Sequence, residues 1–474
     1  MKLFRTALLL IASLLLTGLC GPLTLSAARA TDFYDEPGVR LLNQPVSEYR
    51  ARRQKLLDET KDGIVLILGN VEESMGVEAR YRQNNWMAYL TGVRTPGAVL
   101  MLVPQGLPSA GGAREIVFIP PRNLQMESWT GVQLAPGAEA ARTFGMERVL
   151  SADELWPMLK EAAALPATKN AAGQSAMKLY TFAPRRAVNG FMREYEFVER
   201  ARKELPNVEI ATGERSITNI VAEMRKAKSP AEVALLQKAI DITGAAQRDI
   251  MARLRPGMYE FEVQAILEAA FTRNGAERPG FPSIVGSGIY STILHYEENH
   301  KKIEENDLVV CDIGAEYSLY TADITRTFPA SGKFTPRQRA VYQLVLDTQT
   351  AIAAYWKPGV THADLQRFAQ DYLRKSPLRA RDVDGREYTM EHFFIHSFGH
   401  YLGMDVHDVG NSTLPMRPGE VFTIEPGIYI QTEKLGVRIE DDYLITSENS
   451  VRKLSEKIPS APDEIERIMA AGRR

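Results

Sequence analysis

Two aspartates in the C-terminal half of the sequence are spaced so that a hairpin would bring them together. Asp312 closes the apolar run 308–311, and Asp323 follows eleven positions later, after a Gly-Ala turn and a tyrosine-rich segment. A single aspartate in such a place is usually a turn former or a solvated side chain. Two carboxylates on neighbouring strands could instead bind a cation, provided that other ligands lie nearby.

Histidines supply such neighbours. Three of the seven histidines in the chain, His396, His400 and His407, lie within twelve positions. The segment is not the H-E-x-x-H helix of zinc proteases, because no glutamate follows the first histidine and Gly399 and Gly403 would weaken a helix. A lone histidine is usually structural, but this clustering beside carboxylates favours a functional site.

Two glutamates complete the set. Glu425 follows the apolar run 421–424 and precedes a Pro-Gly pair, so it lies where a strand breaks into a turn, a common place for functional residues. In the segment 437–440, strand alternation puts Arg438 and Glu440 on one face and two apolar side chains on the other. That face is polar on a strand that is otherwise suited to burial.

Four carboxylates with imidazole beside them form a hard, oxygen-rich ligand set, which suits Mn²⁺ or a similar divalent cation better than a thiolate site would. Two cations fit this set better than one, because carboxylates can bridge. Two ions about 3.5–4 Å apart can hold a hydroxide between them and polarise a carbonyl. The chemistry predicted by these residues is therefore hydrolysis of a peptide bond.

The surrounding pattern is that of an α/β protein in which short apolar runs alternate with helical stretches. In the second half, the sequence Ser229-Pro230-Ala231-Glu232 predicts a capped helix that runs to about residue 254. A second helix is predicted over 259–273. The other predicted elements are a helix over 49–60 and strands over 64–68, 98–103, 115–119, 308–313, 316–328, 421–425 and 436–446.

The first thirty residues have the pattern of a secretory signal peptide. Lys2 and Arg5 precede an apolar stretch that is too short for a membrane span, and Ala28-Arg29-Ala30 ends it as a cleavage site. A lipid anchor on Cys20 is the less favoured alternative, because the residue before a lipidated cysteine is normally small and here it is leucine. We expect an exported protein that is cleaved after Ala30, with no stable membrane span.

Composition narrows the partners and the domain count. Removing residues 1–30 takes three of the 57 basic residues and no acid, which leaves 54 against 59 and a net charge of −5. Nucleic acid is therefore an unsuitable partner. Only Cys311 remains after cleavage, so no intrachain disulfide can form. The predicted organisation is a signal peptide (1–30), an N-terminal domain (31–210) and a catalytic domain (211–474).

The motifs resemble those of the aminopeptidase P and prolidase metallopeptidases, which share the pita-bread fold. The resemblance spans nearly the whole chain after residue 30. It is carried, in the order of the sequence, by Tyr81-Arg82-Gln83-Asn84, Tyr89-Leu90-Thr91-Gly92, Phe118-Ile119-Pro120-Pro121-Arg122, His295-Tyr296-Glu297-Glu298-Asn299, Asp323-Ile324-Thr325-Arg326-Thr327-Phe328-Pro329, Asp405-Val406-His407-Asp408-Val409-Gly410, Glu425-Pro426-Gly427-Ile428-Tyr429 and Arg438-Ile439-Glu440-Asp441-Asp442. An N-terminal α/β domain followed by a pita-bread catalytic domain is the fold that it implies.

The resemblance also implies a role for each site residue. Asp323 and Glu440 would bridge two divalent metal ions, most favourably Mn²⁺, and Asp312 would bind one of them, while His400 and Glu425 would bind the other. Glu425 would also carry the proton of the nucleophile, and His407 would stabilise the tetrahedral intermediate. His295 and His396 would shape the proline subsite, and Arg438 would pair with acidic neighbours or with the far end of the substrate.

Two positions depart from the family pattern. Ser397 stands where relatives usually carry glycine, and Trp86 stands where many aminopeptidase P relatives have an aspartate that helps to hold the amino end of the substrate. The implied activity is removal of the residue that precedes a proline at the N-terminus of a peptide. A prolidase that cleaves only Xaa-Pro dipeptides and a non-catalytic exported binding homologue are the alternatives. The resemblance implies a homodimer or homotetramer.

Overall fold

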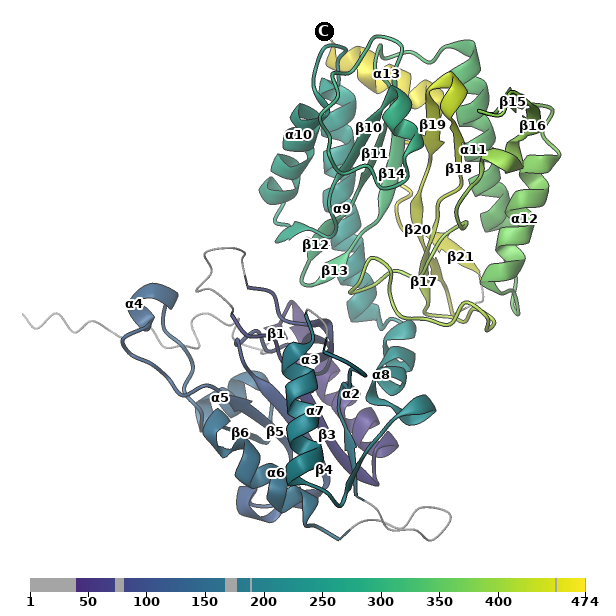
Figure 1. The fold of residues 1–474 in the computed structure, drawn as a ribbon. Helices are drawn as coiled ribbons and strands as arrows, with labels where there is room; N and C mark the ends of the chain where they lie inside the picture. The colour runs from purple at the N-terminus through teal and green to yellow at the C-terminus, as the bar shows by residue number, and fades with distance from the viewer. Residues whose placement is uncertain (1–39, 73–80, 167–176, 188–189, 448–449, 474) are drawn as a thin grey trace, which may run out of the picture.

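The computed structural model describes residues 40–72, 81–166, 177–187, 190–447 and 450–473, which form two lobes (Figure 1). The predicted signal peptide and its cleavage site lie outside these residues. The first lobe holds the elements up to β8, and the second holds those from α9 to the C-terminus (Figure 1). Helix α8 (Ile217–Lys226) packs against the first lobe and leads into the second. The predicted domain boundary at 210/211 falls between β8 and α8.

The N-terminal lobe is built from short strands and helices that follow one another closely along the chain. Its elements are β1 (Arg40–Leu41), β2 (Gln44–Pro45), α2 (Val46–Glu59), β3 (Gly63–Leu68), α3 (Asn85–Thr91), β4 (Val99–Leu107), β5 (Ala113–Ile119), α4 (Glu127–Thr130), α5 (Ala138–Phe144), β6 (Arg148–Ser151), α6 (Leu155–Ala163), β7 (Met177–Tyr180), α7 (Met192–Glu204) and β8 (Val208–Ile210).

A six-stranded mixed sheet of order β6-β5-β4-β3-β7-β8 forms the centre of this lobe. Its strands alternate between two cores: Val65 and Ile67 pack with α2 and α3, whereas Leu66 and Leu68 pack with α6 and α7. Strands read as continuous apolar runs because both faces of the sheet are covered. The strands predicted over 64–68, 98–103 and 115–119 are confirmed, as is the helix predicted over 49–60.

The C-terminal lobe contains longer helices and several small antiparallel sheets. Its elements are α9 (Pro230–Arg253), α10 (Glu260–Arg273), β9 (Arg278–Pro279), β10 (Ile284–Ser287), β11 (Leu308–Ile313), β12 (Ala315–Tyr317), β13 (Tyr320–Thr321), β14 (Ile324–Pro329), α11 (Pro336–Tyr355), α12 (His362–Arg374), β15 (Arg379–Arg381), β16 (Glu387–Thr389), β17 (Val421–Ile424), β18 (Gly427–Ile430), β19 (Leu435–Arg438), β20 (Asp441–Ile445), β21 (Val451–Lys453) and α13 (Pro462–Gly472).

Helices α9 and α10 lie on one side of these sheets, and α11 and α12 lie on the other (Figure 1). Helix α9 begins as the sequence predicts. The Ser229 hydroxyl accepts from the Glu232 amide at 3.3 Å, and the Glu232 carboxylate accepts from the Ser229 amide at 2.9 Å, which closes a capping box. One apolar core runs from α9 and α10 through the strands to α11 and α12.

Two predicted strands are wrong in their continuity. The segment predicted as one strand over 316–328 is divided into β12, β13 and β14, because Ser318 and Leu319 adopt positive φ angles of 50° and 68° and turn the chain. The strand predicted over 436–446 breaks between β19 and β20, at Ile439 and Glu440. Both breaks lie beside predicted site residues.

Within the part of the chain that the structure describes, no helix combines the length and the apolar character needed to cross a membrane. Cys311 lies on β11 and is fully buried with a free thiol. Burial raises its pKa, so this thiol is held in its protonated, unreactive form.

Candidate active site

One cavity of about 380 Å³ in the C-terminal lobe is lined by every site residue that the sequence predicts. The nine predicted residues are His295, Asp312, Asp323, His396, His400, His407, Glu425, Arg438 and Glu440. The other lining residues are Phe281, Ile284, Leu294, Ser397 and Val406. The structure therefore brings together side chains that are up to 145 positions apart in the sequence.

Antiparallel pairing of β11 with β14 holds the two aspartates at the same end of a hairpin. Asp312 pairs with Thr325, and Ile313 pairs with Ile324, so Asp323 comes directly before the paired segment. Gly314 allows the chain to close here, because a Cβ at this position would lie 1.9 Å from the Ala322 carbonyl oxygen. The hairpin predicted from the spacing of Asp312 and Asp323 is confirmed.

The two glutamates come from the neighbouring sheet. Strand β17 pairs with β20 so that Ile424 lies opposite Asp441, which places Glu425 and Glu440 at the same end of the pair. The Thr325 hydroxyl donates to Glu440 Oε2 at 2.6 Å and fixes that carboxylate in the cavity. Glu440 lies in the break between β19 and β20, and its side chain lines the cavity together with Arg438, as the predicted alternation requires.

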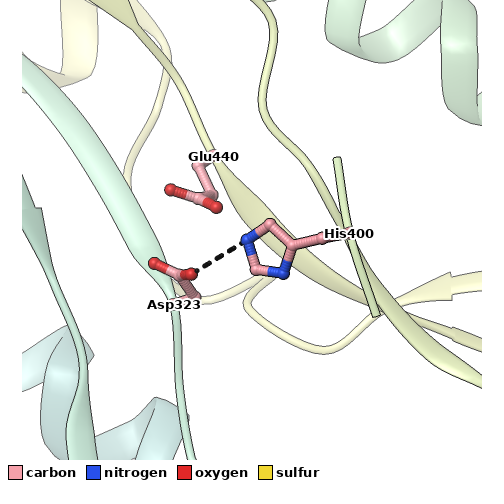
Figure 2. Close-up of side chains that lie close together, drawn as sticks. All are labelled: Asp323, His400 and Glu440. Carbon is pink, nitrogen blue, oxygen red and sulfur yellow. Dashed lines mark ion pairs between the residues drawn. The ribbon is translucent and has the colours of Figure 1, made fainter. Parts of the chain in front are cut away.

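Figure 2 shows the most compact group in the cavity, in which the Asp323, His400 and Glu440 side chains converge. One potential ligand atom from each of the three lies within 4.8 Å of the others. His400 Nδ1 lies 3.0 Å from the Tyr401 carbonyl oxygen, which can only accept, so Nδ1 carries the hydrogen. His400 Nε2 then faces Asp323 Oδ2 at 3.3 Å and Glu425 Oε1 at 3.4 Å.

The other two predicted ligands border this group. Glu425 lies beside His400 in the same cavity. Asp312 accepts from Arg438 Nη2 at 2.6 Å through Oδ2, while its buried Oδ1 has no hydrogen-bond partner within the described residues. Three of the five predicted ligands are thus grouped tightly, and the remaining two lie within the same polar wall.

Burial of these acids in one cavity changes their protonation. Burial, and then repulsion from Glu440 and Asp312, raises the pKa of Asp323 well above its ordinary value. Burial, followed by the charges of Glu425 and Asp312, does the same to the pKa of Glu440. Burial is also the main cause of the raised pKa of Glu425. Without a cation, the cavity therefore favours protonated carboxyl groups over carboxylates.

A hydrogen-bonded chain adjoins these acids and includes a residue to which the sequence analysis gave no role. Arg438 Nη1 donates to the Tyr429 hydroxyl at 2.9 Å, and that hydroxyl lies 2.9 Å from His396 Nε2. His396 Nδ1 is bonded to the Ser397 carbonyl oxygen at 2.8 Å. Burial and the charge of Arg438 lower the pKa of His396 to about 3, so its ring is neutral and Tyr429 is the donor.

The remaining predicted residues lie nearer to solvent. His295 and His407 are exposed at the mouth of the cavity, and the His407 ring meets the His400 ring edge-on at 4.4 Å between centroids. Burial and the positive potential of the neighbouring histidines lower the pKa of His407. Trp86 is not among the lining residues. It lies in the N-terminal lobe, where the Arg225 guanidinium sits 5.5 Å from its ring centroid.

The residues that the sequence analysis missed are of two kinds. Tyr429 belongs to a motif that carried the resemblance. It lies an even number of positions after Glu425, and this spacing was the signal that could have placed both side chains on one face. The apolar residues Phe281, Ile284 and Leu294 come from segments without polar side chains in a recognisable pattern, so nothing in the sequence distinguishes them from ordinary core residues.

Comparisons with known proteins identify the family of this chain. Residues 234–447 match the model of metallopeptidase family M24, and residues 49–170 match the aminopeptidase P N-terminal domain. The Xaa-Pro aminopeptidase of Escherichia coli K12 is 34% identical over 449 residues, which cover 90% of this chain and 98% of that protein. The chain belongs to metallopeptidase family M24.

Other relatives and solved structures extend the match over both lobes. Human Xaa-Pro aminopeptidase 3 is 30% identical over 89% of this chain and 85% of its own. The Pseudomonas aeruginosa aminopeptidase PepP superposes with a TM-score of 0.76 at 30% identity, covering 91% of this chain and 99% of that chain. Zinc-substituted E. coli aminopeptidase P in complex with product gives 0.75 at 33% identity over 90% and 99%.

These matches confirm the resemblance and the fold predicted from the motifs. The chain is an M24 metallopeptidase with an aminopeptidase P N-terminal domain, and its C-terminal lobe has the pita-bread fold. The family uses divalent metal ions, and the group of Asp323, His400 and Glu440 is a candidate site for one.

Proposed function

We propose that this protein is an exported, dinuclear metal-dependent aminopeptidase that hydrolyses the bond between the first residue of a peptide and a proline in second place. The observation that carries the proposal is the convergence of all nine predicted site residues on one cavity. Support comes from relatives that are named Xaa-Pro aminopeptidases and that match nearly their whole length.

The residues present fit a pair of divalent cations. When the imidazole is neutral and the carboxyl groups are ionised, His400 Nε2 and the two carboxylate oxygens at 3.3 and 3.4 Å are all acceptors. A buried oxygen of Asp312 also lacks a hydrogen-bond partner within the described residues. Acceptors that converge in this way are stabilised by a cation. Asp312, Asp323, His400, Glu425 and Glu440 would hold the two ions.

Divalent cations in such a site polarise a substrate carbonyl and lower the pKa of water. We propose Mn²⁺ because four of the five ligands are carboxylates. One solved structure of E. coli aminopeptidase P is described as zinc-substituted. Metal analysis of the purified protein measures which ion this chain binds.

The proton chemistry falls to the chain's own residues. Glu425 is largely buried and has a raised pKa, so its carboxylate readily takes a proton and can pass it to the leaving nitrogen. His407 stands at the cavity mouth with a lowered pKa, so it is neutral near pH 7 and offers one ring N–H. That donor is suited to the oxygen that gains charge during attack on the carbonyl.

His396 makes this part of the cavity better suited to a proline ring than to a polar side chain. Both of its ring nitrogens are already engaged, one with Ser397 and the other with Tyr429. The imidazole therefore presents its ring surface to the cavity, beside the apolar side chain of Leu294. Proline has no N–H and a fixed φ near −65°, so a rigid apolar contact can select it where a hydrogen bond from the backbone cannot.

Export is proposed from the signal-peptide pattern of residues 1–30. The mature chain would begin at Thr31. Mass spectrometry of protein recovered from the periplasm or the medium measures this directly, and an intact N-terminus or a lipid on Cys20 would contradict it. Light scattering of the same sample measures whether it forms the homodimer or homotetramer that the family resemblance implies.

The substrate specificity is tested with three peptides supplied together with Mn²⁺. We expect Ala-Pro-Ala to be cleaved between its first two residues and Ala-Ala-Ala to be cleaved roughly 10–200-fold less efficiently, because loss of one shaped contact costs about 1–3 kcal/mol. Cleavage of the dipeptide Ala-Pro alone would identify a prolidase. Turnover of none of the three by the metal-loaded protein would favour a non-catalytic binding protein.

A further inference from the structure

Two segments that carry three of the five predicted metal ligands are both contacted by the N-terminal lobe. We call residues 308–329, which include β11 to β14, the ligand hairpin, and residues 400–408 the histidine loop. The ligand hairpin carries Asp312 and Asp323, and the histidine loop carries His400 and His407. The segments meet directly through a backbone hydrogen bond from the Thr321 amide to the Gly403 carbonyl at 3.0 Å and through the contact of His400 with Asp323.

Arg82 of the N-terminal lobe grips the ligand hairpin. Its Nε lies 3.0 Å from each carboxylate oxygen of Glu316, and its Nη2 lies 2.8 Å from Oε2. Glu316 stands on β12, between the two aspartates in sequence, and its side chain is almost fully buried. Arg278 donates to the same two oxygens at 2.9 and 3.1 Å.

The contact of Arg82 and Arg278 with Glu316 is between charged groups. Burial alone would raise the pKa of Glu316, but hydrogen bonds from Arg82 and Arg278 outweigh it and hold the pKa below its ordinary value. The carboxylate is thus ionised and fully hydrogen-bonded at neutral pH. Removing one guanidinium from such a buried pair leaves a partly uncompensated charge, which the hairpin can relieve only by moving.

Asn85 of the same lobe grips the histidine loop. Its Nδ2 donates to the Met404 carbonyl at 3.0 Å and to Asp405 Oδ1 at 2.6 Å. Asp405 Oδ2 in turn accepts from Arg225 Nη2 at 2.7 Å. Arg82 Nη2 also reaches the Met404 carbonyl, at 3.5 Å. Arg82 and Asn85 are three positions apart, so one short segment contacts both ligand-bearing parts of the site.

We propose that Arg82 and Asn85 are positioning residues that set the separation of the ligand hairpin and the histidine loop, so that the N-terminal lobe completes the metal site of the C-terminal lobe. The inference rests on the proposed function for the metal ligands and for the choice of substrate. Neither Arg82 nor Asn85 lines the cavity. They can still affect the reaction, because a shift of about 1 Å in a ligand-bearing segment can cost on the order of 100-fold in rate.

Arg82→Met in the full-length protein tests this, because methionine keeps much of the apolar stem and removes the guanidinium. The matched control is Arg94→Met. Arg94 bridges the same two lobes, with Nη1 3.7 Å from Glu277 Oε1, but its side chain is 48% exposed and, among the described residues, forms no ion pair with either segment. Each protein is freed of metal, titrated with Co²⁺, and assayed on Ala-Pro-Ala for kcat and KM separately.

We expect Arg82→Met to lower kcat by about 10–100-fold with less than about a threefold change in KM. We also expect weaker Co²⁺ binding and an altered visible spectrum of the bound cobalt, which reports ligand geometry. Arg82→Lys should recover part of each loss, and Arg94→Met should behave as the unaltered protein. The cobalt results do not depend on the substrate, so they separate failure of this inference from failure of the proposed specificity.

Asn85→Ala is the second variant, and it serves if Arg82→Met does not fold. It removes only the contacts to the histidine loop, and we expect the same pattern of a lower kcat and weaker Co²⁺ binding. The proposal is overturned if the folded variants keep kcat, Co²⁺ affinity and the cobalt spectrum and lose only thermal stability. It is equally overturned if Arg94→Met reproduces their losses.

Discussion

His400 Nε2 lies 3.3 Å from Asp323 Oδ2, while the other ring nitrogen is committed to the Tyr401 carbonyl. The contact is an acceptor facing an acceptor when the imidazole is neutral and the Asp323 carboxyl group is ionised, and it becomes favourable when a cation is shared between the two side chains. Asp323 also has Glu440 within the same compact group. We therefore expect the charge of Asp323 to be the one on which cation binding depends most.

We expect Asp323→Asn to lower kcat/KM for Ala-Pro-Ala by more than about 100-fold and to weaken metal binding, because an amide cannot neutralise a cation and loss of even an indirect ligand contact costs 10–100-fold. Asp347→Asn is the control, since Asp347 is an exposed aspartate on α11. Metal content by mass spectrometry accompanies the assay. Retention of full activity by Asp323→Asn at full metal occupancy would contradict the assignment.

A second prediction concerns Tyr429, whose hydroxyl joins Arg438 to His396. Tyr429→Phe removes an acceptor for a buried guanidinium and a donor to a buried imidazole, and each unsatisfied buried group costs about 1–3 kcal/mol. Because His396 Nε2 loses its hydrogen-bond partner, we expect the imidazole ring to rotate away from its present position. The result should be a fall of roughly 5–150-fold in kcat/KM for Ala-Pro-Ala, with a smaller effect on Ala-Ala-Ala.

The matched control is Tyr388→Phe, which removes an exposed tyrosine hydroxyl that bonds to Asp384 at 2.6 Å. It should leave both substrates unaffected. An equal loss of activity toward Ala-Pro-Ala and Ala-Ala-Ala in Tyr429→Phe would mean that the residue supports the site in general and does not shape the proline subsite.

The features that the sequence predicted correctly are those stabilised by interactions between residues close together in the chain. The capping box at Ser229 and Glu232 needs only residues three positions apart, and the apolar run of β11 needs only burial on both faces. The Asp312–Asp323 hairpin follows from one turn. These features could be predicted because the interactions that stabilise them lie within a few residues of one another.

Features that depend on distant contacts could not be predicted in this way. The predicted strand 436–446 breaks at Glu440 because the chain changes its pairing partner there, from β18 to β17, and the Glu440 carboxylate bonds to Thr325, 115 positions away. The Arg82–Glu316 pair spans 234 positions, and nothing in either segment indicates the other. The site residues themselves were predicted mainly because family motifs record the outcome of such contacts.

The last prediction follows from the raised pKa values of Asp323, Glu425 and Glu440 in the metal-free site. An acid whose pKa is higher in the folded state than in the unfolded chain binds protons more readily when folded, so folding is favoured at low pH. That advantage disappears as the pH rises above the ordinary carboxyl pKa of about 4 and then through the raised values. The metal-free protein should therefore lose stability as the pH rises above the ordinary carboxyl pKa of about 4.

A bound cation removes this penalty, because it compensates the carboxylate charges that otherwise repel one another. We expect Mn²⁺ to raise the melting temperature of chelator-treated protein more at pH 7.5 than at pH 5, where protons already neutralise part of the site and compete with the metal. Binding at a hundredfold excess over Kd adds about 2.7 kcal/mol to the free energy of unfolding, which thermal-shift measurements resolve easily. In Asp323→Asn the Mn²⁺-dependent gain at pH 7.5 should shrink, whereas in Asp347→Asn it should not. A gain that is the same at both pH values would show that the cation is not held by these buried carboxylates, and would move the metal site elsewhere on the chain.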